Sequence, residues 1–308
     1  MVMRTRKDRA TPVVLSQLIW RSLIYLAYPA CRLIYLAWRS YGAVVLSVFG
    51  FSGLCVPVSA PLTAVDSAAL PAGVEVEFAG TSGTHRRERL ASCWDTRFED
   101  AAPVRSFRWA AGQRYFSGWW WSATTGRHVG HESWLERDQA MMLDFDPQVV
   151  AFSSQPFWLS WTDAGRIRRH APDYFARLGD GTAAVIDVRA DDQIPVKDAG
   201  VFEMTARACA SVGWAYRRVG EADPVLAANV RWLAGYRHPR CMDREQASRL
   251  REVFACPGAL LAGARAAGDP LAVLPVLYHL LWTGVLVTDL APALLGAESV
   301  VTVSGGAR

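Results

Sequence analysis

The alternation of apolar and polar residues becomes regular after residue 130, and a helical spacing comes first. Residues 131–145 (HESWLERDQAMMLDF) carry apolar side chains three or four positions apart, and residues 144–147 end the pattern. We therefore predict a helix over this segment. The apolar residues near this spacing are Trp134, Leu135, Met141, Met142 and Phe145.

Strand patterns follow this helix. Residues 148–161 read as one or two strands interrupted at Gln155-Pro156, and residues 166–178 read as another strand. A tight turn at residues 179–181 then leads into the apolar run 183–189 (AAVIDVR). The last two strands therefore form a predicted hairpin.

Three further segments complete this region. Residues 199–212 have helical spacing, residues 214–219 read as a strand, and residues 224–236 are again helical. The order helix, three strands, helix, strand, helix predicts an α/β sandwich. Folded sequence is expected to begin at residues 74–78, where polar and apolar positions alternate.

After residue 240 the pattern is mainly helical. The predicted helices cover residues 243–254, 260–266 and 270–282, and two short strands cover residues 284–290 and 299–303. Asp269 as N-cap and Pro270 at the first helical position give the third helix a clear start. Three helices and a hairpin predict a winged-helix-like domain over residues 241–308. No Lys or Arg lies between Asp269 and Val303, which favours protein docking over DNA contact.

Residues 1–73 form a hydrophobic and basic extension and linker, for which three interpretations stay open. Residues 41–58 are uncharged, about as long as a bilayer span, and preceded by arginines. Residues 58–60 resemble a signal-peptide cleavage site, although the basic lead is too long for one. The favoured interpretation is a non-native or disordered extension, with a true start downstream of the first Met.

Aromatic residues crowd the segment 107–121 and are interleaved with arginines. Such a mixture can stack on bases or cross a DNA backbone. It can equally pack as a lid over the domain, and for an enzyme acting on duplex DNA we expect packing.

Composition limits the possible partners and compartment. The chain has 33 Lys+Arg against 29 Asp+Glu, an excess too small for wholesale coating of nucleic acid, so DNA contacts must come from local patches. Its six cysteines are scattered without a CxxC pair, which argues against a structural zinc site or a disulfide framework. Unpaired thiols fit a reducing cytoplasm.

The candidate chemistry lies on the predicted hairpin. Residues two apart share one face of a strand, so Asp187 and Arg189 project together with Val185. Asp173 follows Pro172 on the preceding strand, which the turn brings alongside. Two carboxylates on adjacent strands suit Mg²⁺ (or Mn²⁺), which takes one or two carboxylates and keeps several waters. Glu136 completes the site if the first helix packs against the hairpin.

These motifs resemble a known family. The runs HESWLERD, LDFDP, QPF, RRHAPDYF and VIDVR are similar to the nuclease domain of TnsA-like endonuclease subunits of heteromeric transposases, members of the PD-(D/E)xK restriction-endonuclease-like group. The likeness covers roughly residues 105–240. It implies a restriction-endonuclease-like mixed sheet flanked by helices, with residues 74–240 as the nuclease domain. It also implies Glu136 and Asp173 as metal-binding acids and places Asp187 and Arg189 at the third motif; Glu132 competes with Glu136, which the family spacing favours.

One position departs from the wider group, which has Lys where this chain has Arg189. A guanidinium cannot act as a general base near neutrality, but it can hold a phosphate bidentately. Lys197, one of only two lysines, is a candidate for the missing amine. His170 and Gln155 are further accessory candidates.

The residues predict a divalent-metal site, and the resemblance implies a metal-dependent endonuclease that hydrolyses DNA phosphodiesters at transposon ends. Its implied partners are double-stranded DNA, a TnsB-like DDE transposase and a TnsC-like AAA+ regulator. Two alternatives stay open: a catalytically inactive DNA-binding or scaffold subunit, and a stand-alone restriction-like nuclease.

Overall fold

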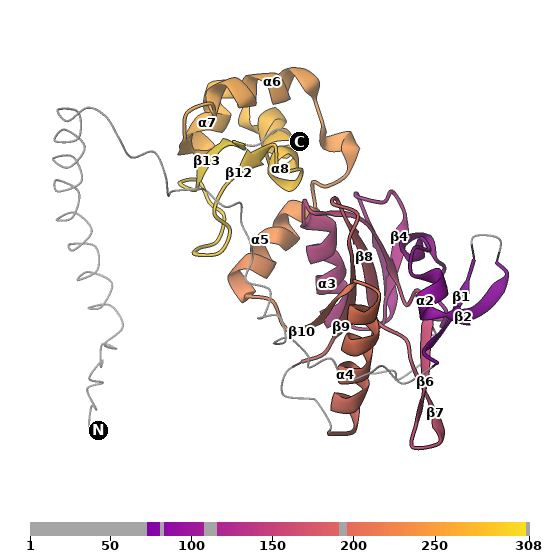
Figure 1. The fold of residues 1–308 in the computed structure, drawn as a ribbon. Helices are drawn as coiled ribbons and strands as arrows, with labels where there is room; N and C mark the ends of the chain where they lie inside the picture. Colours follow the sequence, from indigo (N-terminus) through magenta and orange to yellow (C-terminus); the bar gives the residue numbers. More distant parts are fainter. Residues whose placement is uncertain (1–72, 81–82, 108–115, 191–195, 306–308) are drawn as a thin grey trace, which may run out of the picture. The chain divides into compact units, whose positions relative to one another are not determined.

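The computed structural model describes residues 73–80, 83–107, 116–190 and 196–305 (Figure 1). The predicted N-terminal extension, apart from Gly73, lies outside these ranges. The described chain mixes helices with several mostly antiparallel sheets. Within it, no helix combines the length and apolarity that a membrane crossing requires.

The central sheet has four strands in the order β10-β9-β8-β5, and it is built from the segments in which strands were predicted. Its strands are β5 (Val149–Ser154), β8 (Tyr174–Leu178), β9 (Ala183–Val188) and β10 (Ala215–Val219). The β9 and β10 pair is parallel, whereas β5 with β8 and β8 with β9 are antiparallel. A parallel pair needs a crossover, and the helix α4 (Val196–Ser211) supplies it.

Two helices cover the two faces of this sheet (Figure 1). Ile186 and Val188 pack with the helix α3 (Trp134–Phe145), whereas Val185 packs on the opposite face with α4 residues such as Ala208. The predicted alternation along residues 183–189 is therefore confirmed.

A second four-stranded sheet, in the order β2-β1-β6-β7, shares the core on the α4 face. Its strands are β1 (Glu75–Ala79), β2 (His85–Arg89), β6 (Trp158–Asp163) and β7 (Arg166–His170). The short helix α2 (Leu90–Cys93) and the 3-10 turn η1 (Phe98–Asp100) follow β2. Phe98, fully buried, contacts Phe78, Phe157, Phe175 and Trp214 edge to face, which joins the two sheets.

The prediction of a single strand over residues 166–178 is wrong. The segment contains two strands, β7 and β8, which belong to different sheets and are separated by Ala171-Pro172-Asp173. Proline has no backbone N–H to continue a ladder, so the chain changes sheets there. The break predicted at Gln155-Pro156 is confirmed, and it marks the same kind of change, from β5 to β6.

The aromatic segment is only partly packed. Its described end forms β3 (Gly118–Trp121), which pairs with β4 (His128–His131). Trp120 donates its indole N–H to Asp144, whereas Phe116 and Trp119 are more than half exposed. The expectation of packing therefore holds for Trp120 and not for these two neighbours.

Beyond the central sheet, the helix α5 (Pro224–Ala234) and the turn η3 (Pro239–Cys241) lead into a mainly helical region. Its helices are α6 (Arg244–Val253), α7 (Leu260–Ala267) and α8 (Pro270–Trp282), and its strands are β11 (Gly258–Ala259), β12 (Leu286–Val287) and β13 (Val300–Val303). The three helices were predicted; the first predicted strand is much shorter than expected. Asp269 caps α8 by accepting from the N–H of Leu271.

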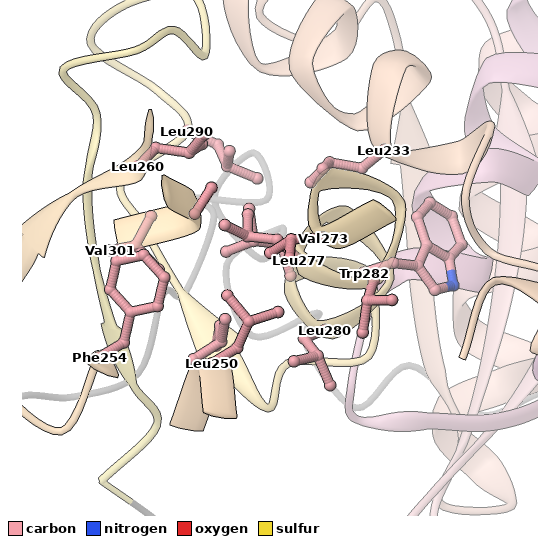
Figure 2. Close-up of a cluster of buried hydrophobic side chains, with 14 of the residues drawn as sticks. Leu233, Leu250, Phe254, Leu260, Val273, Leu277, Leu280, Trp282, Leu290 and Val301 are labelled. Carbon is pink, nitrogen blue, oxygen red and sulfur yellow. The ribbon is translucent and has the colours of Figure 1, made fainter. Parts of the chain in front are cut away.

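The hydrophobic core of this region extends across residue 240. Figure 2 shows Leu233 of α5 beside Leu277 and Trp282 of α8, and the same cluster includes Met141 of α3. Phe145 of α3 also lies against Trp282, with 5.2 Å between ring centroids. The C-terminal region therefore shares its core with the preceding helices.

Candidate active site

The two proline-containing crossings between the sheets lie side by side. At one crossing the chain leaves β5 through Gln155-Pro156, and at the other it enters β8 through Pro172-Asp173. The N–H of Gln155 donates to the carbonyl oxygen of Asp173 at 2.9 Å, which ties the crossings together. The candidate residues gather around this junction.

Asp173 is a buried carboxylate at the start of β8. Its Oδ2 accepts a 2.7 Å hydrogen bond from the N–H of Val188, the residue between Asp187 and Arg189. Burial, followed by the charges of Asp187 and Glu136, holds the pKa of Asp173 well above its usual range. This carboxyl group therefore sits where additional positive charge would stabilise its ionised form.

Asp187 lies on β9 and is 1% exposed. The Nε2 of His170 lies 2.9 Å from both of its carboxylate oxygens, and the hydroxyl of Tyr216 donates to Oδ2 at 2.7 Å. Burial and the nearby Asp187 raise the pKa of Tyr216, so the phenol keeps the proton that it donates. These contacts fix Asp187 between β7 of one sheet and β10 of the other.

Glu136 occupies the first turn of α3. The N-cap Ser133 accepts from the N–H of Glu136, and the Glu136 carboxylate in turn accepts from the Ser133 hydroxyl and the N–H of Glu132. This resembles a capping box, except that the Glu136 carboxylate binds the N–H of the residue before the N-cap, and it satisfies donors at the helix start. Burial raises the pKa of Glu136, while the charge of Arg189 opposes the rise. The competing acid Glu132 instead forms an ion pair with Arg105 at 2.6 Å.

Arg189 follows β9 and is exposed, unlike the three acids. Its Nη1 donates to the carbonyl oxygen of Val188 at 3.0 Å, and its backbone N–H donates to Val219. Burial raises the pKa of both Asp173 and Glu136, and the positive charge of Arg189 opposes part of that rise in each case. The side chain of Lys197 lies outside the described residues.

The structure thus joins Asp173 to the end of β9, where Asp187 and Arg189 flank Val188, with His170 and Gln155 beside them. The charge of Glu136, from the start of α3, contributes to the raised pKa of Asp173. Within the described ranges, no group of three or more His, Cys, Asp or Glu side chains is placed so that it could hold a metal ion. Mg²⁺ needs only one or two carboxylates, because water and substrate phosphate fill its other positions. Asp173 and Asp187, buried and mutually repelling, fit that requirement.

A third buried aspartate, Asp144, shows how a structural carboxylate differs from Asp173. Asp144 of α3 accepts hydrogen bonds from Trp120 Nε1, Ser122 Oγ and the backbone N–H groups of Ala123 and Thr124, at 2.7 to 3.1 Å. Asp173 has one donor among the described residues, the N–H of Val188. Asp144, which anchors a turn, therefore has more of its hydrogen-bonding capacity satisfied by the described residues than Asp173 has.

Sequence reasoning missed Tyr216 and the capping role of Glu136. The Ser133-x-x-Glu136 spacing is a visible capping signature, whereas nothing local marks Tyr216. Comparison with known proteins adds no assignment: no family model matches the chain, and neither does any curated protein.

Proposed function

We propose that this chain is a divalent-metal-dependent endodeoxyribonuclease that acts as the cutting subunit of a heteromeric transposase. The observation that carries the proposal is the hydrogen bond from the N–H of Val188, which lies between Asp187 and Arg189, to the buried carboxylate of Asp173 at the junction of two sheets. The charge of Glu136 contributes to the raised pKa of Asp173. A hydrolase for phosphodiesters needs acids for a hard cation and a cation for the phosphate, and these residues include both.

The arrangement of the elements supports the same proposal. The sequence α3, β5, β8, β9, α4, β10 gives a four-stranded mixed sheet between two helices, as in a restriction-endonuclease-like core. The hairpin formed by β6 and β7 is inserted into that order. In the C-terminal region the order α6, β11, α7, α8, β12, β13, with sheet order β11-β13-β12, suits a winged helix.

The roles of the residues follow from their positions. Asp173 and Asp187 would hold Mg²⁺, which when bound would neutralise their charge and lower the pKa of a coordinated water. His170 and Tyr216 keep the Asp187 carboxylate oriented. Arg189, at the exposed edge, binds a non-bridging phosphate oxygen and offsets the charge that develops there.

The reaction consumes one water per phosphodiester. The water oxygen forms a bond to phosphorus, the bond from phosphorus to one ester oxygen breaks, and that oxygen takes up a proton. The products are a phosphate monoester and a hydroxyl group, and the proton lost by the attacking water passes to solvent. Arg189 takes no part in that proton transfer, because a guanidinium keeps its protons near neutrality.

In this proposal the C-terminal region docks a protein partner, the TnsB-like transposase or the TnsC-like regulator. The helix α8 has no Lys or Arg, and Leu271 at its start is 86% exposed. Most of the apolar residues of α8 are buried in the core, so the proposed contact concerns its exposed start, where an apolar Leu271 suits a protein partner better than a phosphate backbone.

A second candidate is a scaffold subunit without catalysis. It is favoured by two observations: Arg189 stands where the wider group has Lys, and the Glu136 carboxylate is already used by the helix cap. The nuclease and the scaffold subunit differ in whether metal binding and DNA cleavage require Asp173.

The deciding experiment is Mg²⁺-dependent nicking of duplex DNA by the purified chain, with partner proteins present, for the wild type and Asp173→Asn. We expect Asp173→Asn to abolish nicking and partner binding to persist. Its metal-free melting temperature should equal or exceed that of the wild type, because a disfavoured buried charge is removed. Mg²⁺ should raise the melting temperature of the wild type alone.

The exposed acid Glu221 provides the control, since Glu221→Gln should behave as the wild type in every assay. Absence of Mg²⁺-dependent nicking by the wild type would favour the scaffold. If Asp173→Asn lost both partner binding and nicking, Asp173 would be required for folding and not specifically for cleavage.

A further inference from the structure

Gln155 combines three unusual properties. Its side chain is 1% exposed, and neither Nε2 nor Oε1 has a hydrogen-bond partner in the described part of the chain. Its backbone is in the left-handed region, with φ 47°. A buried carboxamide without partners and a non-glycine residue at positive φ each cost folding free energy.

The backbone of Gln155 is nevertheless held firmly. Its N–H donates to the carbonyl oxygen of Asp173 and its own carbonyl oxygen accepts from the N–H of Val104, each at 2.9 Å. Pro156 follows and begins the crossing to β6. The surrounding fold therefore fixes the backbone of this residue next to Asp173 in a strained conformation, although its side chain makes no hydrogen bond to the described part of the chain.

A fully partnered amide elsewhere shows the contrast. Asn229 of α5 is also buried, but its Nδ2 donates to the carbonyl oxygens of Leu290 and Ala293, and its Oδ1 accepts from the N–H of Leu295, all at 2.8 Å. That amide has a structural role, whereas the Gln155 carboxamide has no hydrogen-bond partner among the residues that the structure describes.

We propose that Gln155 is a positioning residue whose carboxamide binds the hydrated divalent cation at Asp173. Its Oε1 accepts from a water on the cation and its Nε2 donates to a phosphate oxygen of the substrate. A carboxamide suits this ligand because it offers an acceptor and a donor together. The inference rests on the proposed nuclease function and deepens it by adding a residue that is neither acid nor base.

The test uses Gln155→Met, which keeps the length of the side chain and removes its polar atoms. Without metal, its melting temperature should stay within about 2 °C of the wild type or rise, because no hydrogen bond is lost. The matched control, Asn229→Leu, should lower the melting temperature, because three hydrogen bonds are lost. Gln155→Gly, which accepts positive φ without strain, provides a second variant that should fold.

Two functional readouts accompany the melting curves. Calorimetric titration with Mn²⁺ should give about 10- to 100-fold weaker binding for both Gln155 variants, the usual effect of losing a group around a metal site. Nicking in Mg²⁺ should fall by a similar factor.

The outcomes are distinguishable. If the wild type and Gln155→Met bind Mn²⁺ and nick DNA equally well, the proposed role of Gln155 is wrong and the nuclease proposal stands. If Gln155→Met melts as low as Asn229→Leu, its amide is structural and the inference fails. If the wild type neither binds Mn²⁺ nor nicks, both proposals fail.

Discussion

The carboxylate of Asp173 accepts a 2.7 Å hydrogen bond from the backbone N–H of Val188. This bond connects the beginning of β8 to the end of β9, and Val188 lies between Asp187 and Arg189. The segment that carries Asp173 is therefore hydrogen-bonded directly to the backbone of the segment that carries Asp187 and Arg189. A site assembled on paired strands is held more precisely than one on a loop.

Tyr216→Phe should weaken both stability and catalysis. The change removes the 2.7 Å hydrogen bond to Oδ2 of Asp187 and leaves a buried carboxylate with one donor fewer. We expect a loss of about 1 to 3 kcal/mol in the free energy of unfolding. Nicking should fall as well, because Asp187 loses orientation. Denaturant unfolding and nicking rates measure the two effects.

The control for this prediction is Tyr236→Phe, which removes a hydroxyl that makes no hydrogen bond in the described part of the chain. It should leave the free energy of unfolding nearly unchanged. Equal losses from both tyrosine variants would contradict a specific role for the contact between Tyr216 and Asp187.

His131 predicts a pH dependence of stability. Burial and then the charge of Arg137 lower its pKa in the folded chain. The unfolded chain therefore binds more protons as the pH falls below about 6.5, the usual value for histidine. Stability due to this group is complete above that pH and is lost as the pH falls through the lowered folded value.

Melting temperatures of the wild type and His131→Gln, measured from pH 8 to pH 5, check this prediction. The wild type should lose more stability than the variant on acidification, because glutamine does not titrate. Parallel curves for the two proteins would show that protonation of His131 is not coupled to unfolding.

Gly263→Ala should destabilise the C-terminal core. A Cβ at this position in α7 would lie 2.2 Å from Cζ of Phe254, which is fully buried and cannot move away freely. We expect a loss of about 1 to 3 kcal/mol, as for other overpacked cores. Gly200→Ala in α4 is the matched control, since its Cβ meets nothing within 4 Å. That change should stabilise the chain by about 0.5 to 1 kcal/mol.

The local pattern predicted most of the helices and the central strands. The apolar run 183–189 sits between two helical layers, and its period of two correctly placed Val185 and Asp187 on one face. The second sheet was not predicted, because β2 (HRRER) is charged and exposed and has no apolar period. The position of β2 is set by its antiparallel pairing with β1, and the pattern within β2 itself does not reveal that pairing.

The site could be predicted only in part. The grouping of Asp173 with Asp187 follows from the hairpin, but Tyr216 comes from β10, which reaches β9 only after the α4 crossover. His170 belongs to a strand of the other sheet, so its contact with Asp187 depends on how the sheets pack. A contact that depends on a crossover helix or on the packing of two sheets leaves no local pattern in the sequence.

Arg189 distinguishes a charge requirement from a proton-transfer requirement. If its guanidinium binds the scissile phosphate, Arg189→Ala should lower the nicking rate by about 10² to 10³-fold, as removal of one transition-state donor does. Arg189→Lys should keep part of the activity, because the charge remains. The exposed Arg265 of α7 gives the control, since Arg265→Ala should nick as fast as the wild type.

The pH profile adds a second criterion for Arg189. Between about pH 6 and 9 a guanidinium keeps its protons, so the wild-type rate should show no step due to this side chain, whereas a lysine acting as a base would introduce one. Undiminished nicking by both Arg189 variants would remove this residue from the mechanism and direct attention to Lys197. Full activity of Arg189→Lys with a new basic step would instead indicate that this position can serve as a base when its side chain is able to lose a proton.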